Sequence, residues 1–375
     1  MLRDLKLKFK SIFLIFLNFI LKDILFLLCF LLAKFFKYFV KKNNKVLHIS
    51  YPNHIAYNTT KILKSNGINA EYLSIGRSKI WKKYDFFFEQ KSHYSFLREF
   101  YILWFFLVKY KIIHIHFLYT VSKTGWEIKF LKMCNIKIII HLRGNDARDK
   151  NVIQKLHNDF NDLNFHKYLI PEWVEKKKII KTVDHLIVTT RDLLDFHPNA
   201  TYMPFFSPID TKNKFNNNFK KIKIIHATNQ TRVEGSHYIS KCIKSLQKKG
   251  YPIEYIFLKN ESYEKVLKIL KNCHLSIGKL RMGDYANFQV ESMSLGIPIV
   301  TFVRKDIIQK YFYLKTSGII FSEINELNQT IEKIISNPRK LISISQQVKS
   351  FVNKYHNNII ISKRYNKIYN KLYKC

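Results

Sequence analysis

The sequence predicts an α/β protein with two parallel β-sheets, each covered by helices on both faces. Nearly continuous apolar runs of strand length alternate with helix-length segments through both halves of the 375 residues. In the second half, polar turns directly follow the strands, at the sheet edge where α/β domains bind their ligands. A chain of this length also fits two domains better than one.

An apolar segment precedes the first predicted strand. Residues 11–33 contain 17 Ile, Leu or Phe. A helix of this length reaches roughly 34 Å at about 1.5 Å per residue, enough to span a bilayer. Lys22 and Asp23 interrupt it, and their insertion penalty of about 5–7 kcal/mol makes spanning marginal. The segment is too long for a signal peptide and lacks a small-residue cleavage site. We expect residues 1–43 to associate with a membrane, either spanning it or embedded in it.

The next part of the chain, residues 44–207, is expected to form a Rossmann-like domain. Its apolar runs predict five strands: VLHIS (46–50), AEYLSI (70–75), IIHIHF (112–117), the start of KIIIHLRGNDAR (137–148) and LIVTT (186–190). These runs are rich in Ile and Val, as in strands buried on both faces. His114 and His116 alternate with apolar residues, so both point to one face of their strand, which favours a structural role.

Residues 208–355 repeat the alternation. The run IKIIHATNQTRVEG, from residue 222, predicts a strand followed by a polar turn and a helix. IEYIFL (253–258) predicts another strand, and Ile297, Ile299, Val300 and Phe302 form a strand before residue 303. Gly296 followed by Pro298 is typical of the end of a helix. Residues 288–295 are therefore predicted to form a short helix, with Asn287 as its N-cap.

The loop before this short helix is a candidate anion site. The free N–H groups at a helix N-terminus favour a diphosphate, and Lys279 and Arg281 lie in the loop. Glu291, one turn into the helix, can accept hydrogen bonds from two vicinal hydroxyls, as on a ribose. Together these features predict a phosphorylated, ribose-bearing ligand. The alternative is that Glu291 is a surface residue and the two cations are solvated.

Arginine usage supports a site for anions. Only 11 of the 64 basic residues are arginine, and Arg143, Arg148, Arg232 and Arg281 all fall in predicted strand-to-helix turns. Arginine binds phosphate and carboxylate in a bidentate way that lysine does not match. Chance scatter remains the alternative.

The second half resembles the donor-binding domain of retaining GT-B glycosyltransferases, in particular family 4, the group 1 glycosyltransferases. The resemblance implies that Glu291 binds the donor ribose and that the run from Gly283 to Ala286 is a variant of the family's Gly-x-Tyr-Gly loop. Gly283 replaces the first glutamate of the family's pair, and Glu234 replaces the lysine before Gly235. The implied donor-binding set is Arg232, Lys279, Arg281, Tyr285, Asn287, Phe288 and Glu291.

The run HLRGND in the first half resembles the family's His-Gly-Ser-Asp motif. It implies that His141 contacts the donor sugar, with Arg143 and Asp146 as further catalytic candidates for phosphate and acceptor. A structural histidine at the strand end is the alternative for His141. Asn58 and Thr59 lie in the first loop, where the family places the acceptor, although the usual glycine pair is absent.

The resemblance also implies an architecture. We expect two Rossmann-like domains that face each other across a cleft, preceded by the hydrophobic helical segment. Residues 356–375, with a helix at about 359–373, would cross back to the first domain.

No metal or other cofactor is expected. The chain lacks an Asp-x-Asp pair, and its histidines lack zinc-ligand spacing. A helix N-terminus with Arg and Lys can stabilise a diphosphate leaving group instead. The five cysteines are scattered and odd in number, which favours a reduced cytoplasmic compartment.

The formal net charge of +37 points to an anionic partner. Anionic lipid attracts a basic surface at about 1 kcal/mol per well-placed lysine, whereas no nucleic-acid-binding motif is present. We therefore expect a bacterial-type, metal-independent hexosyltransferase at the cytoplasmic face of the inner (cell) membrane. It would move a sugar from a nucleotide diphosphate donor to a lipid-linked or surface-glycan acceptor, such as lipopolysaccharide or capsule, with retention implied by the resemblance. The alternatives are a GT-B fold nucleotide-sugar epimerase and a noncatalytic membrane-bound binding protein.

Overall fold

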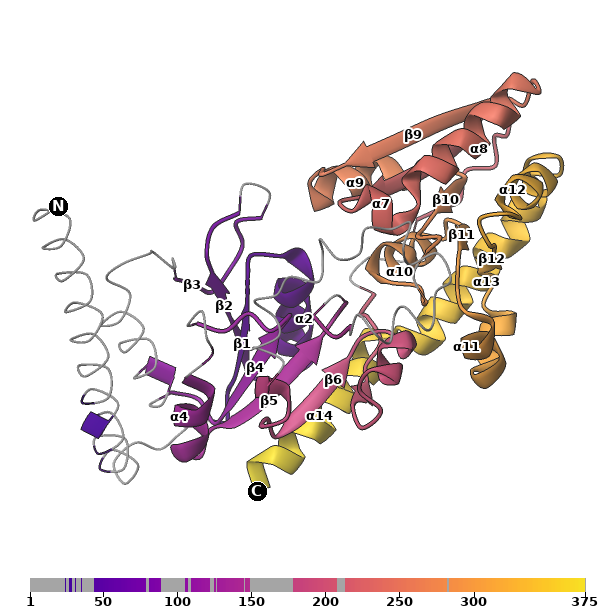
Figure 1. Cartoon of the computed structure of the whole chain (residues 1–375). Coiled ribbons are helices and arrows are strands. Elements are labelled where there is room, and N and C mark those ends of the chain that lie inside the picture. The colour runs from indigo at the N-terminus through magenta and orange to yellow at the C-terminus, as the bar shows by residue number, and fades with distance from the viewer. Residues whose placement is uncertain are drawn as a thin grey trace, which may run out of the picture.

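The computed structural model describes residues 44–78, 81–88, 105–106, 109–121, 125, 127–144, 146–148, 178–207, 213–281 and 283–374, with isolated positions before residue 36. Two parallel sheets organise these residues, one in each half of the chain (Figure 1). Residues 11–33 lie almost entirely outside the described part, so their membrane association stays a prediction. Among the described residues, no helix is long and apolar enough to cross a membrane.

The first sheet has seven parallel strands in the order β3–β2–β1–β4–β5–β6–β7. The five strands expected from the sequence are confirmed, and two short edge strands, β3 and β7, join them. The strands are β1 (Val46–Ser50), β2 (Ala70–Ile75), β3 (Phe86–Phe88), β4 (Ile112–His116), β5 (Lys137–Leu142), β6 (His185–Val188) and β7 (Thr201–Tyr202).

Both faces of the first sheet are buried, as continuous apolar strands require. On one face, Leu47, Ile113 and Ile138 pack with α4 (Glu127–Met133). On the other, Val46 and Ile139 pack with α2 (His54–Ser65) and α14 (Asn358–Lys374). Strand order reverses between β1 and β4, so a crevice opens beyond their carboxyl ends. The 3₁₀ helix η3 (Arg191–Asp195) follows β6 at the same edge.

The second sheet has five parallel strands in the order β12–β11–β10–β8–β9, and its order reverses between β8 and β10. Its strands are β8 (Ile222–Thr228), β9 (Ile253–Lys259), β10 (Leu275–Ile277), β11 (Ile299–Thr301) and β12 (Ile320–Phe321). The helices and the 3₁₀ helix η4 around it are α7 (Thr231–Glu234), α8 (Ser236–Lys248), α9 (Tyr263–Leu270), α10 (Asn287–Ser294), α11 (Lys305–Lys310), η4 (Phe312–Thr316), α12 (Leu327–Ile335) and α13 (Lys340–Tyr355).

The short helix after β10 is confirmed as α10, but its start is corrected by one residue. Ala286 is the N-cap position and Asn287 is the first helical residue. Gln289 accepts a hydrogen bond from the Ala286 N–H at 3.2 Å, so Asn287 is not needed as a cap. Gly296 ends the helix with a positive φ of 74°, as the Gly-x-Pro pattern predicts.

The end of the chain returns to the first sheet. Helix α13 packs in the second half, and α14 then runs along the first sheet (Figure 1). Tyr365 and Tyr369 of α14 are fully buried against strands β1 and β5. The domain boundary near residue 208 stays a prediction, because residues 208–212 lie outside the described part.

Candidate functional site

A pocket of about 310 Å³, counting its opening to solvent, lies where the carboxyl-end loops of the two halves meet. From the first half, His54, Asn58 and Thr59 on α2 and Arg143 after β5 line it. From the second half, Asn287 and Glu291 on α10 line it. The remaining lining residues are Ile55, Pro204, Phe205, Phe206 and Tyr365. Both sheets therefore contribute to one site, as their strand-order reversals predict.

Glu291 is held at this pocket by contacts from both halves. Its carboxylate accepts a hydrogen bond from the Asn287 side chain, one turn earlier on α10. Its Oε1 also lies 3.6 Å from Nε2 of His54, and His54 stacks on Tyr263 with ring centroids 4.5 Å apart. A carboxylate has about four acceptor positions, so these contacts leave room for a vicinal diol.

The cations of the donor loop lie beside α7 rather than in the pocket lining. Lys279 is buried, and burial lowers its pKa, although the Asp192 charge nearby opposes this shift. The Arg281 guanidinium lies over the ring of Tyr238 at 5.5 Å. Arg232 is exposed on α7. Glu234 also lies near Lys279. Burial raises the pKa of the Glu234 carboxyl, and the charge of Lys279 opposes part of that rise.

Gly283 has a packing reason for its departure from the family pattern. A Cβ at this position would lie 2.8 Å from Cβ of Asp192 in the other half of the chain. That distance is shorter than real Cβ contacts, so a glutamate here would push the two halves apart. The close approach of this loop to η3 therefore explains why a glycine, and not the first glutamate of the family's pair, stands at position 283.

Two further members of the expected donor set, Tyr285 and Phe288, also lie outside the pocket lining. Tyr285 is buried, with its hydroxyl 3.0 Å from Nε2 of His356 and its ring under the Arg191 guanidinium at 4.8 Å. Phe288 packs within the apolar clusters around α10. Both side chains therefore serve packing in this structure rather than the pocket surface.

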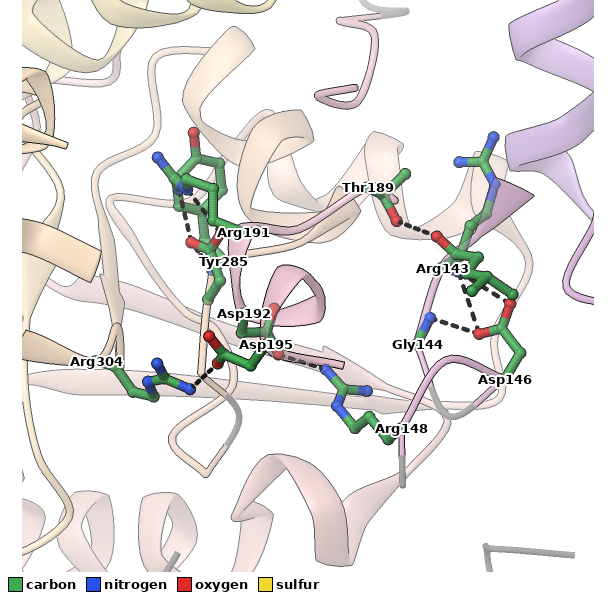
Figure 2. Close-up of polar contacts among 12 residues, drawn as sticks. Arg143, Gly144, Asp146, Arg148, Thr189, Arg191, Asp192, Asp195, Tyr285 and Arg304 are labelled. Carbon is green, nitrogen blue, oxygen red and sulfur yellow. Dashed lines mark hydrogen bonds and ion pairs between the residues drawn. The ribbon is translucent and has the colours of Figure 1, made fainter. Parts of the chain in front are cut away.

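The catalytic set expected from HLRGND is only partly brought to the pocket. His141 is fully buried within the sheet, which favours its structural alternative. The Asp146 carboxylate accepts the backbone N–H groups of Arg143 at 3.0 Å and Gly144 at 2.6 Å, so it fixes the loop (Figure 2). Of the described residues of this run, Arg143 is the one that lines the pocket.

Four histidines stack within the first sheet beneath Arg143. They are His48 on β1, His114 and His116 on β4 and His141 on β5. Burial lowers the pKa of each of them, to about 3 for His48. The ring nitrogens of the first three lie within 4.8 Å of one another, a spacing that metal ligands can have.

The geometry of these histidines favours a hydrogen-bonded array over a metal centre. Nδ1 of His48 and Nε2 of His116 lie 2.9 Å apart, at hydrogen-bonding distance. The Arg143 guanidinium donates to Nδ1 of His116 at 3.1–3.2 Å. A cation between these rings would face that guanidinium and would have to break both contacts.

Ion pairs between the halves are a feature that the sequence analysis missed. Arg191 on η3 binds Asp284 at 2.6 Å, and each side chain is 1% exposed. Arg304 binds Asp195 across the same boundary, beside the Arg148–Asp192 pair of the first half (Figure 2). No local pattern marks these pairs, because their partners lie far apart in sequence.

No protein-family model and no curated protein sequence matches the chain. Among solved structures, it is similar to sucrose-phosphate synthase from Thermosynechococcus elongatus, with a TM-score of 0.62 and 10% identity over 88% of this chain and 100% of that one. HepE from Anabaena, solved in complex with UDP-glucose, gives 0.60 and 10% over 87% and 99%. The UDP-GlcNAc 2-epimerase from Neisseria meningitidis, bound to UDP-GlcNAc, gives 0.53 and 13% over 87% and 100%.

At these identities the similarity establishes architecture alone. It agrees with the two parallel sheets, the pocket between their carboxyl edges and the C-terminal helix that returns to the first sheet. The chain has the GT-B fold.

Proposed function

We propose that this protein is a glycosyltransferase that uses a nucleotide diphosphate sugar as donor. The observation that carries the proposal is the placement of Glu291, a buried carboxylate on the first turns of α10, at a pocket shared by both halves. Sucrose-phosphate synthase and HepE in complex with UDP-glucose have higher TM-scores than the epimerase, which favours transfer over epimerisation. UDP-sugars are therefore the first donors to test.

The proposed mechanism follows from the order of groups along the donor. The ribose hydroxyls donate to Glu291, and the diphosphate lies at the N-terminus of α10, the helix that follows the loop carrying Lys279 and Arg281. The sugar then extends toward Asn58, Thr59 and Arg143, where the acceptor enters. As the bond between the anomeric carbon and the phosphate oxygen breaks, the diphosphate takes the electron pair. The acceptor hydroxyl oxygen bonds to the anomeric carbon, and its proton passes to the departing diphosphate. The helix N-terminus and the cations of the donor loop stabilise the negative charge that develops on the diphosphate, so the proposed mechanism does not call for a metal ion.

Glu291→Gln is expected to weaken donor binding by about tenfold to a hundredfold. The change keeps the shape of the side chain and removes one charge-assisted acceptor, which is worth about 1.5–3 kcal/mol. Titration calorimetry with UDP and UDP-glucose measures the effect. Glu326→Gln, at an exposed position on the second half, is the matched control. Equal donor affinity in the Glu291 variant and the wild type would refute the ribose assignment.

Product analysis separates transfer from the two other functions. The protein is incubated with a panel of nucleotide sugars, with and without extracted lipid acceptors. A transferase releases the nucleoside diphosphate faster when acceptor is present. An epimerase changes the sugar without needing an acceptor, and a binding protein leaves the donor intact.

We further propose that the enzyme works at the cytoplasmic face of the inner membrane on a lipid-linked or surface-glycan acceptor. The support is the apolar run at 11–33 and the charge of +37. Salt screens attraction to anionic lipid over about 8 Å at physiological ionic strength, but it does not screen apolar insertion. We expect 1 M salt to leave the full chain in the membrane fraction, and to release a chain that begins at Lys45 from anionic vesicles. Release of the full chain by salt alone would contradict insertion.

A further inference from the structure

No carboxylate among the described residues forms a direct ion pair with Arg143. Burial lowers the pKa of its guanidinium to about 10, and the charge of Asp146, which acts from beyond ion-pair distance, opposes only part of that shift. The Arg143 side chain is 8% exposed, and its guanidinium donates to His116, His141 and Thr59. Asp146, three residues later, uses its carboxylate oxygens on the backbone N–H groups of Arg143 and Gly144. A buried guanidinium without a counter-charge is costly, and such groups are normally paired. The other buried arginines of this edge, Arg148 and Arg191, each bind an aspartate.

The histidines around Arg143 supply hydrogen-bond acceptors but no negative charge. Arginine only donates, so Nδ1 of His116 accepts and the proton of this neutral ring is on Nε2. That proton is donated to Nδ1 of His48 at 2.9 Å. Nε2 of His48 donates in turn to the Tyr369 hydroxyl at 3.3 Å, and that hydroxyl donates to Nδ1 of His114 at 2.9 Å. Each ring in this chain is neutral, so the array orients the guanidinium without compensating its charge.

The same contacts leave one edge of the guanidinium available. Nε and Nη2 form the edge that faces Nδ1 of His116, at 3.2 and 3.1 Å. The other edge consists of the two terminal nitrogens, and its contacts are the long ones from Nη2 to His141 and Thr59, at 3.4 and 3.5 Å. Phe117 and Phe205 flank the group, with ring centroids 5.8 and 6.0 Å from Cζ. Arginine uses an edge of this kind for bidentate binding of an oxyanion.

We propose that Arg143 binds an oxyanion, a carboxylate or a phosphate, carried by one of the substrates in the pocket. Arg143 lines the pocket from the first half, across from Asn287 and Glu291 of the second. The nature of the ligand rests on the proposed function: the oxyanion belongs to the donor diphosphate, to an acidic transferred sugar, or to a phosphorylated acceptor. The substrate thus supplies a directly bound counter-charge, which Asp146 does not provide because its carboxylate is held by backbone N–H groups.

Binding to Arg143→Gln tests the proposal and identifies the source. Loss of about tenfold or more in affinity for UDP assigns the donor diphosphate. A loss for UDP-glucuronate but not for UDP-glucose assigns a sugar carboxylate. A rise in melting temperature on adding inorganic phosphate to the UDP-saturated wild type, absent from the variant, assigns an acceptor phosphate. Arg143→Lys, which keeps the charge but not the bidentate edge, is expected to recover only part of the affinity. Equal responses of Arg143→Gln and the wild type to all these probes would overturn the proposal.

Stability without ligand is an independent readout. Glutamine can still donate to His116, so we expect Arg143→Gln to melt no lower than the wild type. The control is Arg148→Gln, which removes the ion-pair partner of the buried Asp192 carboxylate and is expected to melt several degrees lower. If Arg143→Gln falls as far as Arg148→Gln, the guanidinium is a structural support of the histidines and the proposal is wrong. If no nucleotide sugar binds the wild type, the proposed function fails, while the stability comparison and inorganic phosphate, added alone, still decide on Arg143.

Discussion

Asp284→Asn is expected to lower the free energy of unfolding by about 3–5 kcal/mol, because it leaves the Arg191 guanidinium buried without a counter-charge. The Asp284 carboxylate accepts three hydrogen bonds from Arg191, from the backbone N–H at 2.8 Å, Nε at 2.8 Å and Nη2 at 2.6 Å. Urea unfolding followed by circular dichroism measures the loss. Asp306→Asn is the matched control, since Asp306 binds Arg304 at a side chain that is 63% exposed. Exposed pairs contribute about 0–1 kcal/mol, so comparable losses in the two variants would contradict the argument.

The surroundings of Arg191 explain why the pair is hard to replace. Its guanidinium lies 4.8–5.8 Å from the ring centroids of Tyr202, Tyr285, Tyr311 and Tyr313. Lysine lacks the planar group that stacks on these rings and binds Asp284 through two nitrogens, so Arg191→Lys should not restore stability. The double variant Arg191→Met with Asp284→Leu is expected to lose less than Asp284→Asn, because neither charge remains buried alone. Arg191 comes from the first half and Asp284 from the second, so this cluster couples the two sheets.

Local pattern predicted the strands and the helix that carries Glu291. Apolar runs bounded by polar turns gave each long strand, and the Gly296–Pro298 signal fixed the end of α10 and so the phase of its residues. Once that phase is known, Glu291 must lie one turn into the helix, at the edge where ligands bind. The short strands β3 and β7 escaped prediction because two or three residues show no periodicity.

Residues whose roles depend on contacts between distant parts of the chain could not be predicted from the sequence. The partners of the Arg191–Asp284 pair are 93 residues apart, and no spacing rule joins them. His141 and Arg143 differ in placement because β5 ends at Leu142. His141 is still part of the strand, with its Nδ1 3.4 Å from the Tyr365 hydroxyl of α14, while Arg143 begins the loop that Asp146 fixes. The alternation of His114 and His116 predicted their shared face. The chain of hydrogen bonds to α14 needed the helix in place.

Acidification is expected to unfold this protein at a pH well above that at which carboxylates protonate. Among the residues that the structure describes, seven buried histidines have a pKa lowered chiefly by burial: His48, His114, His116, His141, His226, His274 and His356. The lowered pKa is about 3 for His48 and about 4 for His226 and His356. The unfolded chain therefore binds protons first, below about pH 6.5, while the folded rings stay neutral. The stability is present above that pH and is lost as the pH falls toward the folded pKa values.

The expected effect is large because the contributions add. Each histidine that is protonated only in the unfolded chain costs up to about 1.4 kcal/mol per pH unit below its unfolded pKa. At pH 5.5 the six of these histidines whose pKa falls to about 3 or 4 or lies well below its usual value, all but His274, together remove up to about 8 kcal/mol. That loss is comparable with the whole stability of a typical domain, about 5–15 kcal/mol. Asp146 and Glu234, whose pKa burial raises, shift stability the other way and offset only part of the loss. We therefore expect acid unfolding near pH 5.5, measured at constant ionic strength by circular dichroism.

A single substitution isolates the contribution of one ring. Nδ1 of His226 donates to the Ile277 carbonyl and its Nε2 accepts from Ser236, both at 2.8 Å, so the buried ring is held neutral. His226→Gln should flatten the dependence of the unfolding free energy on pH between 6 and 5 by about 1.4 kcal/mol per pH unit. We expect this change in slope whatever the variant's stability at neutral pH. The slope depends on the number of protons taken up on unfolding and not on the contacts that the substitution removes. His237→Gln, at an exposed position on α8, should leave the slope unchanged. Equal slopes in all three proteins would mean that the folded state protonates His226 as readily as the unfolded chain does.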